Sequence, residues 1–218
     1  MSFSRAGDGL SERLRLLKSF YQLEHSVWDI GCDHGLLGLS FAGEESVGKL
    51  HLVDPSLPVI DVLKKKLKDS YISIPEKIVI HHQRGQEIIP DPESNCIFIA
   101  GMGGKEIESI LKSILPRLKE KTRLILSPHR NIIELRKFLS EQNVSLETEV
   151  CLNEDNQFYQ IIVIRVGQGT KVSLYGEALW KTPAGEQYRD HMIRHFSSHR
   201  DEASQGLVQY LMNLKVAK

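Results

Sequence analysis

The sequence predicts a doubly wound α/β domain with a mostly parallel sheet. Five short apolar runs recur along the chain, and helix-like stretches separate them. Runs with little polar alternation are typical of strands buried on both faces of a parallel sheet. Two further apolar stretches follow with no room for a helix between them, as in an antiparallel hairpin. Together these patterns predict a seven-stranded sheet with helices on both faces.

The first element expected is an amphipathic helix, because Leu10, Leu14, Leu17 and Tyr21 share one helical face. The predicted parallel strands cover residues 27–30, 50–53, 78–80, 97–100 and 124–126. Ser56 is a suitable N-cap for a helix running to residue 67. Another helix is expected from Gly104 to residue 117. This order gives the βαβ rhythm of a parallel sheet.

The predicted hairpin strands cover residues 146–152 and 158–166, with NEDNQ between them. Beyond them the GQGT turn marks a change of composition, and residues 184–216 are polar, helix-compatible and sparsely apolar. We therefore expect one main domain over residues 1–167 and a short C-terminal helical extension over residues 168–218.

Charge and cysteine content narrow the class of protein. Lys and Arg total 28 and so do Asp and Glu, so any nucleic-acid site has to be a local basic patch. The three cysteines include no CxxC pair, which argues against a disulfide framework and favours a reducing compartment. The sequence shows neither an apolar signal region nor a membrane-length apolar stretch, so we expect a cytoplasmic protein that does not bind membranes.

The first predicted strand runs into DIGCDHG, residues 29–35. Its glycines permit a tight turn and close approach to a ligand at a helix N-terminus. Alone, this motif equally suits a plain turn from strand to helix. The second strand ends at Asp54, about twenty residues later, where a carboxylate can bind a ribose diol. The two signals together favour a nucleoside-containing cofactor.

The fourth predicted strand runs into AGMGG, residues 100–104. Glycine clusters cost backbone entropy, so three glycines in four positions indicate a need for close backbone approach. Parallel sheets bind ligands at the carboxyl ends of their strands. The two glycine turns therefore predict a crevice with a cofactor on one side and a flat substrate on the other.

Five features follow one another along the chain: DIGCDHG, Asp54, IAGMGG, LSPHRN and FYQIIVI. They have the same order and similar intervals in the bacterial tRNA (adenine(22)-N1)-methyltransferases, which the chain resembles over nearly its whole length. The resemblance implies a Rossmann-like class I methyltransferase fold, S-adenosyl-L-methionine as methyl donor, tRNA as substrate and a C-terminal helical domain.

The resemblance also implies site residues. Asp29, Gly31, Asp33 and His34 would lie at the methionine end of the donor, and Asp54 at its ribose. The full donor-binding set predicted is Asp29, Gly31, Cys32, Asp33, His34, Asp54, Pro55, Arg84, Gly85, Ala100 and Gly101, and the predicted transfer site comprises Gly101, Met102, Gly103, Ser127 and His129.

Methyl transfer is an in-line displacement, and adenine N1 already presents a neutral lone pair, so no strong base is required. The protein has to align the nucleophile with the methyl group, which backbone groups can do. His34 then need not act as a base, and we assign it to binding.

The chain departs from the family pattern in three places. Gln83-Arg84-Gly85 stands where the family has a G-D-G turn, so the adenine amino group of the donor would need a main-chain carbonyl or Gln86. Ser127 and His129 stand within LSPH where the family has L-Q-P-N, and both can still bond a base edge. The C-terminal extension is shorter than is usual in the family.

Other polar groups receive simpler interpretations. His81 and His82 are adjacent on a strand and face opposite sides, and we predict no metal site. Arg189, Arg194 and Arg200 are candidates for binding tRNA phosphates, although a charged helix is often simply solvated. We expect a monomer or a weak dimer.

Three functions remain open from the sequence. The leading one is a tRNA adenine-N1 methyltransferase. A methyltransferase of a small molecule or protein is favoured by the neutral charge balance, Arg84 and the short extension. A non-catalytic protein that binds the donor or another nucleoside is the third, and the complete AGMGG loop argues against it.

Overall fold

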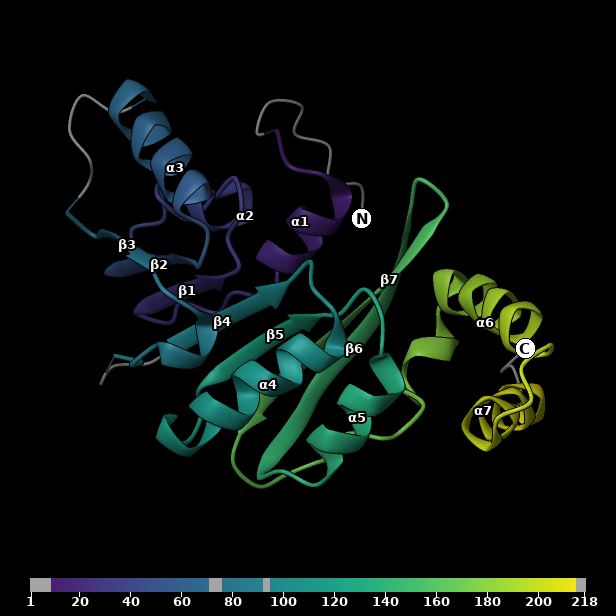
Figure 1. Ribbon diagram of the computed structural model, residues 1–218. Helices are drawn as coiled ribbons and strands as arrows, with labels where there is room; N and C mark the ends of the chain where they lie inside the picture. The colour runs from purple at the N-terminus through teal and green to yellow at the C-terminus, as the bar shows by residue number, and fades with distance from the viewer. Residues whose placement is uncertain (1–8, 71–75, 92–94, 215–218) are drawn as a thin grey trace.

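The computed structural model describes residues 9–70, 76–91 and 95–214. It contains a seven-stranded sheet in the order β3-β2-β1-β4-β5-β7-β6 (Figure 1). The strands β1 to β5 are parallel, and β7 runs antiparallel to both β5 and β6. Their bounds are Ser26–Ile30, Lys49–Asp54, Ile78–His82, Asn95–Ala100, Arg123–Ser127, Val144–Glu154 and Gln157–Val166 for β1 to β7. The predicted fold class is confirmed.

Helices cover both faces of the sheet, which explains why its strands are apolar on both sides. On one face, α4 (Gly104–Ile114) and α5 (Ile132–Ser140) pack in a hydrophobic cluster with β1, β4, β5 and β7. On the other face lie α1 (Glu12–Lys18), α2 (Leu36–Leu39) and α3 (Leu57–Ser70) (Figure 1). Burial of these two layers supplies the main stabilising free energy of the fold.

The prediction of a helix-like stretch between the third and fourth strands was wrong. Among residues 83–91, the structure has a short 3-10 helix over Gly85–Glu87. Twelve residues separate His82 from Asn95, and Pro90 lies among them. Proline lacks the amide hydrogen that a helix interior needs, so Pro90 interrupts a helix in this connection. The other long crossover helices begin where the sequence indicated, with Ser56 O accepting a hydrogen bond from Ile60 N at the start of α3.

The β6/β7 hairpin is longer than predicted. Its strands reach Glu154 and Gln157, so only Asp155 and Asn156 form the turn. Both have positive φ, 52° and 62°. This is the left-handed conformation that two-residue hairpin turns require, and Asp and Asn tolerate it better than most side chains.

The C-terminal extension contains α6 (Pro183–Phe196) and α7 (Glu202–Asn213), which lie beside the β6/β7 hairpin (Figure 1). Tyr188, Met192 and Phe196 on α6 pack in a third hydrophobic cluster with Phe158 of β7. The end of the predicted helical stretch at residue 216 lies outside the described residues. Division of the chain at residue 167 stays a prediction.

All three cysteines are free and buried. Cys32 follows β1, Cys96 lies in β4 and Cys151 lies in β6. Burial raises the pKa of each of these thiols. Among the described helices, none is long and apolar enough to cross a membrane.

Candidate active site

The loop after β1 turns sharply through left-handed backbone conformations. Gly31, Asp33 and Gly35 have φ values of 72°, 47° and 68°. Glycine adopts this region without strain, and Asp is among the few other residues that visit it. Gly35 is the N-cap of α2. The glycines of DIGCDHG therefore let the chain leave β1 and enter α2 within a few residues.

Asp54 joins this loop to the end of β2. One carboxylate oxygen accepts from Asp33 N at 3.2 Å, and the other accepts from Ser56 N at 2.9 Å. Gly31 N and Cys32 N donate to Val53 O at 2.8 and 3.1 Å. The predicted ribose-binding carboxylate is therefore held in place by the backbone of two loops.

Asp29 is buried, and its Oδ2 accepts from Gly38 N of α2 at 2.8 Å. Burial raises the pKa of Asp29 to about 7, opposed by the Gly38 hydrogen bond and assisted by the nearby Asp54 charge. The structure thus places Asp29 beneath the loop, where it holds α2 in position. Asp33 and His34 are instead 70% and 69% exposed at their side chains, with Oδ1 and Nε2 3.7 Å apart. Their polar atoms are accessible to a ligand above the loop, while the buried Cys32 side chain is not.

The AGMGG loop after β4 is bonded to the loop after β5. Gly101 N donates to Ser127 O at 3.3 Å, His129 N to Met102 O at 3.0 Å, and Gly104 N to Arg130 O at 2.7 Å. A Cβ atom at Gly104 would lie 2.3 Å from Asn131 O, so only glycine permits this approach. Gly101 also has a positive φ of 80°.

Met102 connects the two glycine loops. A Cβ atom at Gly31 would lie 2.6 Å from Met102 Cε, so the methionine methyl group covers the backbone of the first loop. Ala100 ends β4, which is next to β1 in the sheet, and Gly101 follows it. The structure therefore brings the two predicted halves of the site together.

The remaining predicted donor residues surround β2 and β3. Pro55 O is bonded to His82 Nε2 at 3.1 Å. Gly85 is buried, and a Cβ atom there would lie 2.6 Å from Ile30 Cγ2. Arg84 is exposed. Gln86 Nε2 donates to Glu106 and Ser109 of α4, at 3.2 and 3.1 Å, so its amide nitrogen is already bonded.

The two predicted base-edge residues after β5 differ in environment. Ser127 is fully buried, and its hydroxyl has no hydrogen-bond partner among the described residues. His129 is exposed, and its Nε2 lies 2.9 Å from Arg13 Nη1. The His129 ring also contacts the Tyr159 ring edge to face, with centroids 5.5 Å apart. Of the two, His129 is the side chain a substrate can reach in this conformation.

A family model for the methyltransferase domain matches residues 10–162. The chain belongs to the methyltransferase domain family. The matched residues 10–162 include both glycine loops, Asp54 and the strands that position them.

The resemblance expected from the motifs is confirmed. The chain is 31% identical over 168 residues to the tRNA (adenine(22)-N(1))-methyltransferase of Bacillus subtilis. That match covers 72% of this chain and 66% of the relative, just under two thirds of its length.

Solved structures are similar over most of the chain. A Streptococcus pneumoniae protein, assigned as a tRNA (m1A22) methyltransferase and solved with S-adenosyl-L-methionine, is 26% identical with a TM-score of 0.79. The likeness covers 93% of this chain and 98% of that one. The m1A22 tRNA methyltransferase TrmK of B. subtilis is 25% identical with a TM-score of 0.73, covering 95% of this chain and 96% of that one.

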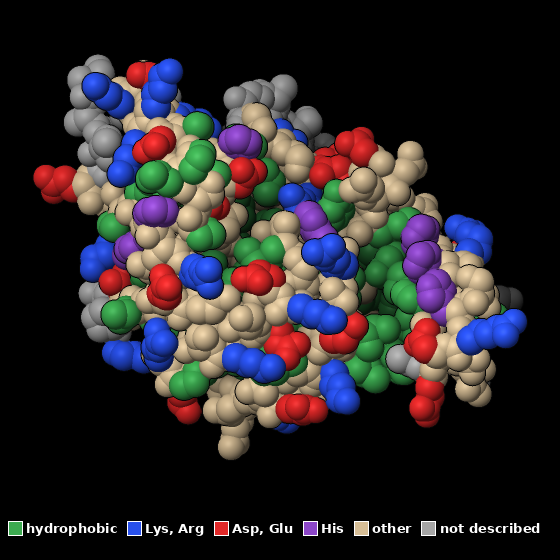
Figure 2. All heavy atoms as spheres, viewed as in Figure 1, with side chains coloured by type: hydrophobic (Ala, Val, Ile, Leu, Met, Phe, Trp, Pro, Cys, Tyr) green, Lys and Arg blue, Asp and Glu red, His purple; other side chains and the backbone are tan. Residues whose placement is uncertain are grey.

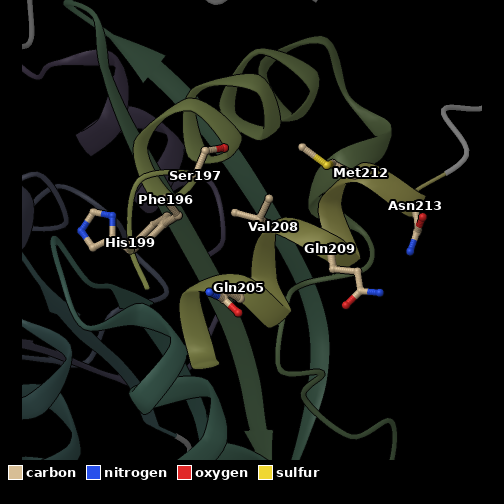
Figure 3. A pocket seen from close by; sticks show the side chains of 8 residues that line it. All are labelled: Phe196, Ser197, His199, Gln205, Val208, Gln209, Met212 and Asn213. Carbon is tan, nitrogen blue, oxygen red and sulfur yellow. The ribbon is translucent and has the colours of Figure 1, made fainter. Parts of the chain in front are cut away.

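The helical extension presents the predicted phosphate-binding residues. Arg194 and Arg200 are exposed, whereas the Arg189 guanidinium donates to Asp190 at 3.0 and 3.2 Å. Figure 2 shows histidine side chains in a row beside hydrophobic surface. In the sequence, His191 and His195 lie in α6, and His199 follows its end. A cavity of about 320 Å³ separates α6 from α7 and is lined by residues including Phe196, Val208 and Met212 (Figure 3). It belongs to the extension and not to the strand ends.

Within residues 9–70, 76–91 and 95–214, no group of three or more His, Cys, Asp or Glu side chains is arranged to hold a metal ion. Sequence reasoning missed Arg13 and Tyr159, which contact His129, and Glu154, which accepts a hydrogen bond from Arg13 N. Arg13 comes from α1, Glu154 from β6 and Tyr159 from β7. No local motif marks any of them.

Proposed function

We propose that this protein is an S-adenosyl-L-methionine-dependent methyltransferase that modifies N1 of an adenine in tRNA, at position 22. The observation that carries the proposal is the meeting of two glycine loops at the carboxyl ends of β1 and β4, with Asp54 fixed beside them. The activities assigned to the similar proteins support the same conclusion.

The residues at the donor side fit this cofactor. Asp54 provides carboxylate oxygens for a ribose diol, and Asp33 and His34 expose polar atoms next to it. The absence of a Cβ at Gly31 lets the turn form and lets the Met102 methyl group pack against its backbone. When bound, the donor supplies a methyl group on a positively charged sulfur. Ala100, Pro55 and Gly85 would complete the wall of this site, with Arg84 at its rim.

At the acceptor side, the chain has to orient an adenine without acting as a base. The amides of the AGMGG loop are held by Ser127 O and Arg130 O, which fixes the loop before substrate binds. Gly101, Met102 and Gly103 would line the path of the methyl group, and His129 would bond the base edge. Such alignment removes much of the entropic barrier to a two-reactant transfer.

Arg189, Arg194 and Arg200 would contact tRNA phosphates from the helical extension. A protein with no net charge needs such a local patch to retain RNA. A tRNA substrate also accords with a cytoplasmic location. A monomer or weak dimer is sufficient, because one chain supplies both glycine loops and the extension.

The test begins with titration calorimetry of S-adenosyl-L-methionine, followed by mass spectrometry of nucleosides from incubated, unmodified tRNA. We expect donor binding and new 1-methyladenosine. Asp54→Ala should weaken donor binding about tenfold or more, because it removes a charged hydrogen-bonding partner. Asp61→Ala on the exposed side of α3 is the matched control. Unchanged donor affinity in Asp54→Ala would contradict the assigned site.

A small-molecule or protein acceptor is the second candidate, favoured by the exposed cation Arg84 and the balanced charge. Retention of tRNA separates the two. For a tRNA enzyme, binding should weaken with salt, and Arg194→Glu with Arg200→Glu should weaken it further. Donor binding with no modified nucleoside and salt-insensitive or absent tRNA binding would favour the second candidate. Absence of donor binding would favour a protein without transferase activity.

A further inference from the structure

Arg13, His129 and Tyr159, which come from elements far apart in the sequence, form a cluster of three side chains in mutual contact. Arg13 Nη1 lies 2.9 Å from His129 Nε2. The same guanidinium lies over the Tyr159 ring, with Cζ 4.8 Å from its centroid. Tyr159 in turn contacts the His129 ring. Arg13 is therefore held between an aromatic face and an imidazole nitrogen.

The chemistry of arginine fixes the direction of the bond to His129. A guanidinium has only donors and stays charged, so Nε2 has to accept. An imidazole that accepts at Nε2 is neutral and carries its proton on Nδ1. Although His129 is exposed, partial desolvation of its ring lowers its pKa, and the nearby Arg13 charge lowers it further, which favours the neutral ring. The remaining ring nitrogen, Nδ1–H, is a donor.

Arg13 is itself positioned by the hairpin. Its backbone N donates to Glu154 Oε1 of β6 at 3.0 Å. On the other side of the cluster, His129 N donates to Met102 O in the AGMGG loop. Hydrogen bonds therefore connect the hairpin, α1, the loop after β5 and the predicted transfer site in series.

We propose that Arg13 is a positioning residue for the acceptor side: it keeps His129 neutral and protonated at Nδ1, so that this ring offers a single fixed hydrogen-bond donor to an acceptor nitrogen of the target base. The inference rests on the proposed function for its substrate. The groups facing His129 are Arg13 from α1 and Tyr159 from β7, with Glu154 of β6 holding Arg13.

The direct test is nitrogen NMR of histidine-labelled full-length protein, assigned with a His129→Gln variant. In the unmodified protein, His129 should stay in the Nδ1–H form between pH 6 and 8. In Arg13→Met, the ring should lose this fixed form and its pKa should rise. Arg13→Lys keeps a donor and a charge, and should restore the tautomer in part. An Nε2–H tautomer in the unmodified protein would overturn the proposal.

Kinetics provide the second arm. Arg13→Met should lower kcat/KM for tRNA about tenfold, since a misplaced base-edge group costs alignment, while donor affinity stays within twofold. If Arg13 acts through His129, adding Arg13→Met to His129→Gln should cause no further loss. Additive losses would overturn the proposal. If the unmodified protein transfers no methyl group to tRNA, the proposed function fails, and the NMR result still decides the role of Arg13.

Discussion

Asp29 illustrates how one side chain can order a loop at a cost in stability. Its carboxylate bonds Gly38 N at the start of α2, and it is buried among apolar groups close to Asp54. Burial disfavours the charged form of a carboxyl more than one amide hydrogen bond favours it. The loop of the candidate site is therefore held by a group whose ionisation opposes folding.

Asp29→Asn tests this residue directly. The folded pKa, about 7, lies above the unfolded value of 3.8. The folded state therefore holds more protons between these values, and the contribution of Asp29 to stability falls as pH rises through this window. The asparagine can retain the bond to Gly38 and does not titrate. From pH 5 to pH 8 the variant should gain about 1–3 kcal/mol relative to the unmodified protein in urea unfolding. A stability difference that is equal at both pH values would show that Asp29 does not titrate in this way.

Residues of the site were predictable where the signal is local. Gly31, Asp54 and Gly101 follow strands directly, so an apolar run and a glycine or carboxylate identify them. Arg13 was not predicted as a site residue because its partners are distant in the sequence: His129 is 116 residues away and Glu154 is 141 residues away. Only the folded chain shows that these side chains meet.

At the scale of elements, the apolar runs predicted all seven strands. The central strands β1, β2, β4 and β5 are buried on two faces and need apolar side chains throughout, whereas the edge strands β3 and β6 are only partly buried. The connections were less predictable. Between β3 and β4 a helix was expected, yet a short 3-10 helix suffices. In the hairpin, polar residues at the ends of β6 and β7 continue the ladder beyond the apolar pattern, since backbone hydrogen bonds form regardless of side-chain polarity.

The hairpin turn offers a test of backbone strain. Asn156 has a φ of 62°, which a β-branched side chain tolerates poorly. Asn156→Val should lower the free energy of unfolding by about 1–2 kcal/mol, whereas Asn156→Gly should leave it equal or slightly raised. Denaturant unfolding of both variants provides the comparison. Equal stability of the valine and glycine variants would show that the turn adopts another conformation in solution.

At the scale of the whole molecule, a buried ion pair ties the sheet to the segment that leads into the extension. Arg136 of α5 and Glu149 of β6 are bonded to each other and almost completely buried. Arg136 Nη1 donates to Ser173 O at 2.7 Å, and Ala178 N donates to Glu149 Oε1 at 2.9 Å. The pair thus holds the connection between β7 and α6 from both sides.

Glu149→Gln should therefore be strongly destabilising. It leaves the Arg136 charge buried with a neutral partner, a change that costs about 3–5 kcal/mol. Glu177→Gln, on an exposed neighbouring residue, is the matched control and should change little. Urea unfolding measures both. A loss below about 1 kcal/mol would mean that water or another anion reaches Arg136.

Because its three cysteines are buried, the native protein should react slowly with thiol reagents. A thiol reacts as its thiolate, and burial raises the pKa of all three thiols. Alkylation of each cysteine therefore requires that the surrounding structure opens. Cys96 lies in central strand β4, whereas Cys151 lies in β6 at the sheet edge and Cys32 beside the β1 loop. The labelling rate of each thiol therefore reports how often its own region opens. Comparison of the three rates distinguishes local opening of the sheet edge or of the loop after β1 from unfolding of the whole sheet.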